Sequence, residues 1–414
     1  MPNSADCGGE VPSLSITQAQ KILLETVTPV EGWEMVPIRS ALGRVLRSDV
    51  VAPFNVPAHD NSAMDGFAVQ AADLTAEQNR LELIGTAYAG RAFSGLVGPG
   101  QAVRVMTGAI LPPGADTVIM QEATRFEGDR VVLPRVDKPG QNVRWAGEDL
   151  AAGRPALDAG RRIGPAELGL LASLGLAEVP VHRRPRVAFF STGDELASIG
   201  RPLGPGEVYD SNRYTLYGAL SRLGLEILDL GVVRDDPAAL EHAFSEAAAQ
   251  ADAILTTGGV SVGEADHVRE VMSRLGQVRF WRIDIKPGRP MAFGRLGNAW
   301  LFGLPGNPVA VLVSFYQIVL DALYRLQGAD PLPVHPTFAV PCDSPIRKVP
   351  GRREFPRGVL YQADGRWRVR LSGNQGSGVL RSVTDANCFI CLAEDSGSVT
   401  PGNQVEVQPF LGLI

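Results

Sequence analysis

Short apolar runs alternate with longer segments of helical period over the second half of the chain, from residue 186 onward. The predicted strands are residues 186–190, 226–230, 253–255, 279–283 and 300–302. The predicted helices are residues 212–223, 237–249, 266–275 and 307–326. Strands and helices that alternate with short connections are typical of a doubly wound α/β domain with a largely parallel sheet. We therefore predict such a domain over residues 181–330.

The pattern is different on either side of this domain. One helix is predicted over residues 17–25, where Ser15 is a candidate N-cap, and another over residues 164–174. Short β-type runs between Gly and Pro turns predict a β-rich domain over residues 51–144. This domain is expected to be an insertion into a discontinuous linking domain made of residues 13–50 and 145–180. Short strands resume after residue 331 and predict a small C-terminal β-barrel over residues 331–414.

Composition and charge exclude several classes of partner. A net charge of −6 without a clustered basic face argues against nucleic-acid binding. No window of about 18 uncharged apolar residues occurs, so we expect no membrane span. The first ten residues lack a basic region and an apolar region, and so predict no signal peptide and a cytoplasmic location.

The cysteines do not predict a metal centre. Cys388 and Cys391 form a C-x-x-C, but they lie in an apolar, strand-like run. Residues three apart on a strand face opposite sides, and no nearby histidine or second C-x-x-C completes a tetrahedral site. We therefore expect buried, inert thiols.

The loop over residues 256–266 carries the strongest chemical signal in the chain. It follows a predicted buried strand and contains Gly258, Gly259 and Gly263, which let the backbone N–H groups turn toward an anion. The helix expected to begin near Asp266 adds the positive end of its dipole. Ligands of open α/β sheets bind at the carboxyl ends of the strands, so five loops should converge there. Each loop alone could be an ordinary turn.

The charged residues of these loops fall into two sets. Glu195, Asp235 and Asp266 are hard oxygen donors suited to Mg²⁺. Lys286, Arg289 and Arg357 are cations suited to an oxyanion. Asp236 fits a helix N-cap before Pro237 as well as it fits a metal ligand.

A second polar cluster is predicted in the β-rich N-terminal half of the chain. Its members are Asp60, Asp65, Thr107, Arg144, Glu148 and Asp149. Asp and Asn residues close to glycine are frequent turn formers, and that interpretation stays open. If the cluster belongs to the α/β site, the second subunit of a dimer would have to bring it there.

Together these segments resemble the molybdopterin molybdenumtransferase family, which includes MoeA and the C-terminal domain of gephyrin. The matching stretches are residues 60–68, 104–108, 140–149, 191–196, 210–213, 256–267, 285–294 and 303–308. They occur in family order from about residue 15 to the end, and Asn61-Ser-Ala-Met-Asp-Gly and Gly303-Leu-Pro-Gly-Asn-Pro are the most specific. Arg282 and Arg289 stand where many members have lysine.

The resemblance implies an elongated homodimer, with the linking domain in dimerisation, sites shared between subunits and a molybdopterin adenylyltransferase as a further partner. It implies Mg²⁺-dependent insertion of molybdate into adenylyl-molybdopterin with release of AMP. Catalytic roles are implied for Asp65, Thr107, Arg144, Asp149, Asp235 and Lys286, and metal binding for Glu195 and Asp266. Together with the glycine loop, it implies a substrate-binding set: Gly258, Gly259, Ser261, Gly263, Arg289, Pro290, Pro305, Pro308, Arg357 and Ser377.

Two other functions share parts of this pattern. A nucleotide pyrophosphatase of the competence-damage type would use the same α/β domain, but it would not explain the motif at residues 61–66. A non-enzymatic scaffold that binds the pterin would keep the glycine loops. The carboxylates and the lysine at the loops favour catalysis over a scaffold.

Overall fold

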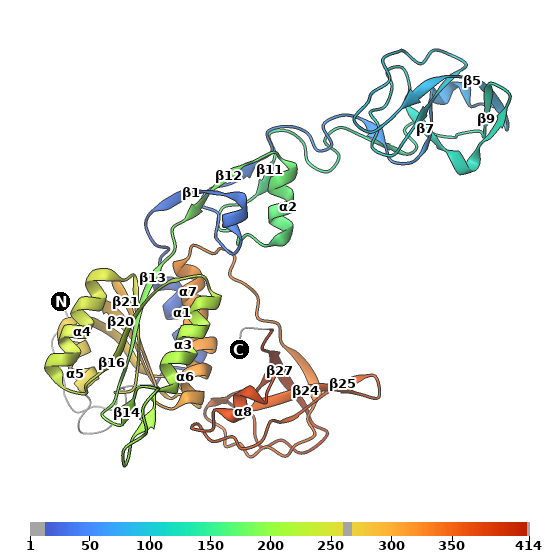
Figure 1. Ribbon diagram of the computed structural model, residues 1–414. Helices are drawn as coiled ribbons and strands as arrows, with labels where there is room; N and C mark the ends of the chain where they lie inside the picture. The colour runs from blue at the N-terminus through green and yellow to red at the C-terminus, as the bar shows by residue number, and fades with distance from the viewer. Residues whose placement is uncertain (1–12, 260–266, 412–414) are drawn as a thin grey trace.

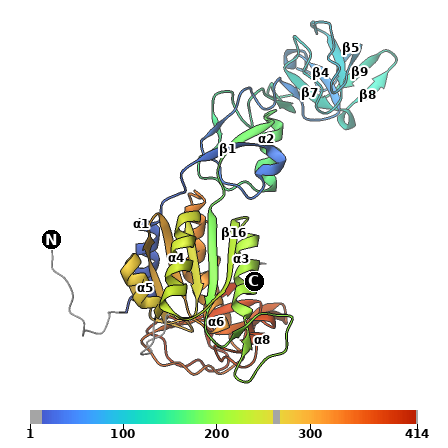
Figure 2. The ribbon, with the colours of Figure 1, turned by 60° about the vertical axis from the view of Figure 1, so that its left-hand side comes forward.

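The computed structural model describes residues 13–259 and 267–411, which form an elongated series of folded units. Figure 1 shows a β-rich unit at one end, and an α/β unit with the C-terminal β unit beside it at the other. A smaller unit, made of two separate stretches of chain, connects the two ends (Figure 2). One chain therefore holds its two predicted polar sites at opposite ends.

A six-stranded sheet forms the centre of the α/β unit, in the order β16-β13-β17-β21-β20-β18. The strands are β13 (Arg186–Thr192), β16 (Glu226–Val233), β17 (Ala253–Thr257), β18 (Gln277–Arg282), β20 (Pro290–Leu296) and β21 (Ala299–Leu304). The first four strands in this order are parallel, and β20 is antiparallel to both neighbours. β18 consequently runs in the same direction as the parallel strands. The largely parallel sheet is confirmed, although β20 was not predicted.

Helices cover both faces of this sheet, which confirms the doubly wound fold. One face carries α3 (Ser211–Arg222) and a continuous helical segment made of α6 (Pro308–Ser314), a π-helical turn (Phe315–Val319) and α7 (Leu320–Leu326). The other face carries α4 (Pro237–Gln250) and α5 (His267–Leu275). Alternate residues of a strand point to opposite faces, so Phe189 joins the first cluster and Phe190 the second.

The segment Pro308–Leu326 belongs to the protein core. Among the described residues it is the one helix long and apolar enough to cross a membrane, but 89% of it is buried inside the protein. Its apolar side chains face the sheet and α1, so its composition is explained by packing.

Helix α1 (Ile16–Thr26) packs on the α/β unit. Ser15 accepts a hydrogen bond from the Gln18 N–H and Gln18 completes the capping box, as expected for the predicted N-cap. Ile16, Ala19 and Leu23 form the buried stripe of this helix and share a core with α7. The apolar stripe of α1 is thus covered by the α/β unit. The assignment of residues 13–50 to the linking domain stays a prediction.

The connecting unit is held together by two pairs of strands. β1 (Trp33–Pro37) pairs antiparallel with β12 (Glu178–His182), and β2 (Val50–Val51) with β11 (Pro155–Leu157). Helix α2 (Pro165–Ser173) and a 3-10 turn (Ile38–Ala41) pack beside them around Leu46, Leu171 and Val181. The two flanks of the β-rich segment are thus joined by strand pairing and by a common core.

The β-rich unit is built on a second six-stranded sheet, in the order β7-β4-β6-β5-β9-β8. Its strands are β4 (Gly66–Val69), β5 (Asn79–Ala87), β6 (Gln101–Val105), β7 (Thr117–Met120), β8 (Arg125–Glu127) and β9 (Arg130–Leu133). Beside it, β3 (Asn61–Ser62) pairs with β10 (Val143–Arg144). Gly66 in β4 cannot carry a side chain, because a Cβ there would lie 2.0 Å from the Ile119 carbonyl oxygen.

The C-terminal unit is a five-stranded sheet in the order β22-β27-β26-β24-β25. The strands are β22 (Phe338–Pro341), β24 (Arg357–Ala363), β25 (Arg366–Leu371), β26 (Cys388–Cys391) and β27 (Gln404–Pro409), with a short helix α8 (Arg381–Thr384). A bridge between Cys342 and Val369 connects the two edges of the sheet, so it closes toward a barrel. Cys388 is buried in its core, and burial raises the pKa of the Cys388 thiol to about 12.

Candidate active site

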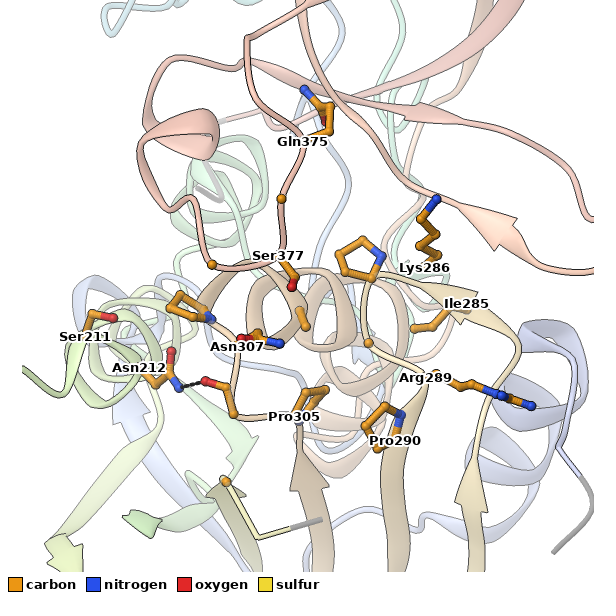
Figure 3. A pocket seen from close by; sticks show the side chains of 18 of the residues that line it. Ser211, Asn212, Ile285, Lys286, Arg289, Pro290, Pro305, Asn307, Gln375 and Ser377 are labelled. Atoms are coloured by element: carbon orange, nitrogen blue, oxygen red, sulfur yellow. Dashed lines mark hydrogen bonds between the residues drawn. The ribbon is translucent and has the colours of Figure 1, made fainter. Parts of the chain in front are cut away.

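The five predicted loops meet at one edge of the α/β sheet. They line a cavity of about 1190 Å³, which is large enough for a nucleotide-sized ligand. The lining residues from these loops include Thr192, Gly193 and Glu195 at the end of β13, Asp235 after β16, Gly258 and Gly259 after β17, Ile285–Pro290 after β18, and Pro305–Pro308 after β21. The C-terminal unit closes the opposite wall, so the cavity lies between two folded units (Figure 3).

Close backbone packing explains the two described glycines of the first loop. Gly258 has a φ of +88°, and a Cβ on it would lie 2.2 Å from the Thr192 carbonyl oxygen. Gly259 has a φ of +64°, and its Cβ would lie 2.3 Å from Val268 Cγ2. Both positions therefore require glycine. Ser261, Gly263 and Asp266, also predicted site residues, lie outside the described residues.

The acidic wall of the cavity contains an unpaired carboxylate oxygen. Asp235 Oδ1 is buried without a hydrogen-bond partner among the described residues. Burial raises the pKa of the Asp235 carboxyl, and Asp194 and Glu195 add to the rise. His267 opposes this rise. Glu195 lines the same wall. This is an arrangement of hard oxygen donors that a divalent cation would satisfy.

The described residues alone do not complete a metal site. No three His, Cys, Asp or Glu side chains among them gather in a metal-binding arrangement. Asp236 caps α4 by accepting hydrogen bonds from the N–H groups of Ala238 and Ala239, at 3.0 and 3.2 Å. The capping interpretation of Asp236 is therefore correct, and Asp235 and Glu195 remain as the described candidate ligands.

Two polar residues of the cavity were not among the predicted site residues. Asp210 is the N-cap of α3 and is only 3% exposed, and no hydrogen bond reaches its Oδ2 atom from the part of the chain that the structure describes. Asn212 donates from Nδ2 to the Gly306 carbonyl oxygen at 2.7 Å, which holds the loop after β21 against α3 (Figure 3). The signal in the sequence was the matching stretch at residues 210–213, which was not assigned a role.

The three predicted cations are in different environments. Lys286 Nζ lies 3.2 Å from the Glu354 carboxylate, and Arg289 Nε lies 3.9 Å from the Asp284 carboxylate. Figure 3 shows the Arg289 side chain extending away from Pro305 and Ser377. Pairing with carboxylates reduces the charge that these two residues present to a ligand, and the sequence did not predict either pair.

Arg357 is the buried cation of the cavity. It is 1% exposed and donates to the Ser382 hydroxyl at 3.1 Å and to the carbonyl oxygens of Asn374 and Gly376 at 3.4 and 3.2 Å. Burial lowers the pKa of the Arg357 guanidinium to about 10. No carboxylate among the described residues pairs with it. An arginine desolvated without a counter-charge is a strong site for an oxyanion.

The remaining predicted binding residues also reach the cavity. Pro290, Pro305 and Pro308 line it, and so does Ser377. The Ser377 carbonyl oxygen accepts a hydrogen bond from the Val309 N–H at 3.0 Å, which joins the C-terminal unit to the start of α6. The segment that presents Ser377 is thereby fixed relative to the loop after β21.

The four residues predicted in the β-rich unit do not reach this cavity in the same chain. Asp65, Thr107, Arg144 and Asp149 lie in or beside the unit at the far end of the molecule (Figure 1). Asp65 Oδ1 accepts hydrogen bonds from the Thr107 N–H and hydroxyl at 2.7 and 2.8 Å, and these bonds lower the pKa of the Asp65 carboxyl. Arg144 and Asp149 are exposed.

Comparison with known proteins accounts for all of these units. Residues 14–175 match the MoeA N-terminal region (domains I and II), residues 188–325 match a probable molybdopterin-binding domain, and residues 339–410 match the MoeA C-terminal region (domain IV). The chain belongs to the MoeA family. The family assignment therefore covers the β-rich, connecting, α/β and C-terminal units together.

Individual members of the family are similar along nearly the whole chain. A molybdopterin molybdenumtransferase of Haemophilus influenzae is 43% identical over 403 residues, which cover 97% of this chain and all of the relative. A molybdopterin molybdenumtransferase of Bacillus subtilis is 36% identical over 385 residues, covering 90% of this chain and 89% of the relative. A solved moeA protein from Pyrococcus horikoshii matches with a TM-score of 0.81 at 32% identity, covering 96% of this chain and 100% of that one.

Proposed function

We propose that the protein inserts molybdate into adenylyl-molybdopterin and releases AMP, to form molybdenum cofactor. One observation carries this proposal beyond family membership. Within the described residues, a single cavity contains a carboxylate oxygen of Asp235 without a hydrogen-bond partner and, in the C-terminal wall, the buried guanidinium of Arg357 without a carboxylate partner. Such a cavity is suited to a divalent cation and an oxyanion at the same time.

The roles of the residues follow from this division of charge. Gly258 and Gly259 allow phosphate oxygens of the adenylyl pterin to approach the backbone, and Arg357, Arg289 and Lys286 attract molybdate. Pro290, Pro305, Pro308 and Ser377 shape the wall between them. Asp235 and Glu195 would hold Mg²⁺, with Asp266 as the further donor expected from the sequence. When bound, Mg²⁺ would neutralise phosphate charge and polarise the anhydride bond for hydrolysis.

No protein nucleophile is needed for this reaction. Water adds to the phosphoanhydride, the P–O bond breaks and AMP leaves. The two dithiolene sulfurs come from the pterin and form the bonds to molybdenum, and one molybdate oxygen leaves as water with the two thiol protons. The chain supplies positioning and electrostatic stabilisation, which are the usual contributions in phosphoryl chemistry.

The β-rich unit takes part in this proposal through a second copy of the chain. Asp65, Thr107, Arg144 and Asp149 would bind the adenylyl part of a substrate held in the partner's α/β cavity. The elongated shape supports a pairing in which the β-rich unit of each copy lies at the α/β unit of its partner. The connecting unit would then lie in the dimer contact. We further propose a cytoplasmic location and a molybdopterin adenylyltransferase as the source of the substrate.

The competing functions explain less of the chain. A pyrophosphatase that uses the α/β domain alone leaves the β-rich and C-terminal matches without a role. A scaffold that binds pterin would not require a buried Asp235 Oδ1 atom without a hydrogen-bond partner among the described residues.

A reconstitution experiment tests the proposal. Purified protein is incubated with adenylyl-molybdopterin, Mg²⁺ and molybdate, and both AMP release and activation of a cofactor-free molybdoenzyme are followed. We expect both signals, each dependent on Mg²⁺. AMP release without activation would indicate the pyrophosphatase, and the absence of both would indicate the scaffold. For variants of Asp235 in this assay, Asp236→Ala is the matched control. Asp236 is the neighbouring carboxylate, and it caps a helix and is not assigned to the site.

A further inference from the structure

A second cavity of about 760 Å³ opens beside the first one, between the loop at residues 284–289 and the loop at residues 347–354. Five residues line both cavities, and they form the boundary between the two spaces: Lys286, Arg289, Arg347, Arg352 and Glu354. The two cavities are therefore direct neighbours, and we name the second one the outer cavity.

The outer cavity has an excess of positive charge. Its lining contains five cations and two carboxylates: Lys286, Arg289, Arg347, Lys348 and Arg352 against Asp284 and Glu354. Both carboxylates are already engaged. Glu354 pairs with Lys286, while Asp284 accepts a hydrogen bond from the Ser13 hydroxyl at 2.7 Å and lies near Arg289. The protein as a whole carries a net charge of −6, so this excess is local and not a reflection of overall composition.

Three of the five cations have no carboxylate partner among the described residues. Lys348 is buried and donates to the carbonyl oxygens of Glu394 and Ser396, at 3.2 and 3.0 Å, so its charge lies beneath the surface and is not available for direct contact. Arg347 and Arg352 are exposed, and no ion pair involves either of them in the described parts of the chain. Their guanidinium groups are the ones that a ligand can contact.

The loop that carries these two arginines is anchored at several points. Ile346 pairs with Val399 through two backbone hydrogen bonds of 2.9 and 2.8 Å, and the Gly351 N–H donates to the Glu394 carbonyl oxygen at 2.7 Å. At the other end, β23 (Arg353–Glu354) pairs parallel with β19 (Ile285–Lys286). The arginines are therefore held next to the loop that carries Lys286 and Arg289, which reduces the entropy lost when a ligand binds.

We propose that Arg347 and Arg352 form an outer binding site for a free, doubly charged tetrahedral oxyanion, which captures molybdate and passes it to the Arg289 side of the main cavity. The proposal rests on the proposed function for the identity of the oxyanion. Its physical basis is separate: two unpaired guanidinium groups at the common boundary of two cavities bind and concentrate divalent anions.

Steady-state kinetics with two matched double variants test this site. R347A/R352A removes the proposed contacts, and R366A/R370A removes the same charge from the exposed positions of β25, which line neither cavity. At low ionic strength we expect R347A/R352A to raise the KM for molybdate about tenfold, with kcat and the KM for adenylyl-molybdopterin unchanged. The difference should shrink in high salt, and R347K/R352K should recover part of it. R366A/R370A should behave like the unsubstituted protein.

Each other result has a definite meaning. An unchanged KM for molybdate in R347A/R352A, measured beside an active unsubstituted protein, overturns the outer site and leaves the proposed function intact. A raised KM for adenylyl-molybdopterin alone would assign the arginines to the adenylate phosphate and overturn the molybdate assignment. If the unsubstituted protein has no turnover, the proposed function fails. Calorimetric titration with molybdate alone then tests the outer site without turnover. R347A/R352A should bind molybdate more weakly than R366A/R370A, and equal affinities would overturn the outer site.

Discussion

The α/β cavity and the polar cluster of the β-rich unit use the same residue types in opposite ways. In the β-rich unit, Asp65 accepts two hydrogen bonds from Thr107, and Asp60 accepts one from the Ala146 N–H at 2.7 Å. In the cavity, Asp235 Oδ1 is buried and accepts no hydrogen bond from any described residue. The hydrogen bonds from Thr107 lower the pKa of Asp65, whereas burial raises the pKa of Asp235.

The difference shows that the carboxylates of the β-rich unit belong to preorganised turns, whereas Asp235 belongs to a candidate binding site. Carboxylates satisfied by backbone N–H groups stabilise the loops in which they lie. A buried carboxylate without a partner costs free energy, and a bound cation would offset that cost. The turn-forming interpretation of Asp60 and Asp65 is thus supported locally, and a catalytic role for Asp65 depends on a second copy of the chain.

The largest effect is expected at the acidic wall. Asp235→Ala and Glu195→Ala should each lower Mg²⁺-dependent AMP release by about 10³-fold, because the metal loses a ligand at the anhydride. Rates measured over a range of Mg²⁺ concentrations check this. Turnover that stays within threefold of the unsubstituted rate would remove Asp235 or Glu195 from the metal site.

Mixing two inactive variants tests whether the two regions form one site. Asp65→Ala and Asp235→Ala subunits, unfolded and refolded together in equal amounts, should restore about a quarter of the original activity. Half of the resulting dimers are mixed, and each mixed dimer contains one intact site. No recovery, with mixed dimers demonstrated by differential tagging, would show that the β-rich cluster does not complete the partner's cavity.

Arg357 should affect stability as well as molybdate binding. Arg357→Ala removes three buried hydrogen bonds and should lower the free energy of unfolding by about 2–4 kcal/mol. Denaturant unfolding measures this loss. Arg366→Ala is the control, because Arg366 is exposed on the hairpin of the same unit. Equal stability of the two variants would mean that the Arg357 hydrogen bonds contribute little.

The smallest effect is expected in the pH dependence of the stability of the metal-free protein. Here the cavity and the β-rich unit should differ in sign. Burial raises the pKa of Asp235 in the folded protein, so its ionised carboxylate destabilises the fold above that pKa and Asp235→Asn should stabilise the fold by less than about 1 kcal/mol. This gain should disappear as the pH falls and Asp235 takes up a proton.

Asp65 should show the opposite sign. Its pKa is lowered by hydrogen bonds, so it stabilises the fold above the unfolded pKa of 3.8 and this contribution is lost as the pH falls through its folded pKa. Asp65→Asn should therefore destabilise at neutral pH. Thermal unfolding of both variants from pH 3 to 7 measures the two signs, and identical signs would contradict the comparison.

Much of the fold followed from local pattern. The β17 residues are all buried and apolar or small, and Ser15 was correctly predicted as an N-cap. For Asp236 the sequence left capping and metal binding open, and the structure shows capping. β20 was missed because it begins at a proline directly after a glycine-containing turn and runs antiparallel beside β21. The packing of α1 was missed because its stripe of Ile16, Ala19 and Leu23 could cover either unit.

The sequence by itself determined the alternation of strands and helices, and therefore that the loops containing Glu195, Asp235, Gly258, Lys286 and Pro305 leave one edge of a sheet. These features depend on side-chain period and glycine spacing, which are local properties. Only the tertiary structure decided which charges are compensated. The pairing of Lys286 with Glu354, the burial of Arg357 and the unpaired oxygen of Asp235 all depend on contacts between segments far apart in the chain. Electrostatic free energy is set by burial and distance, and neither can be read from local order.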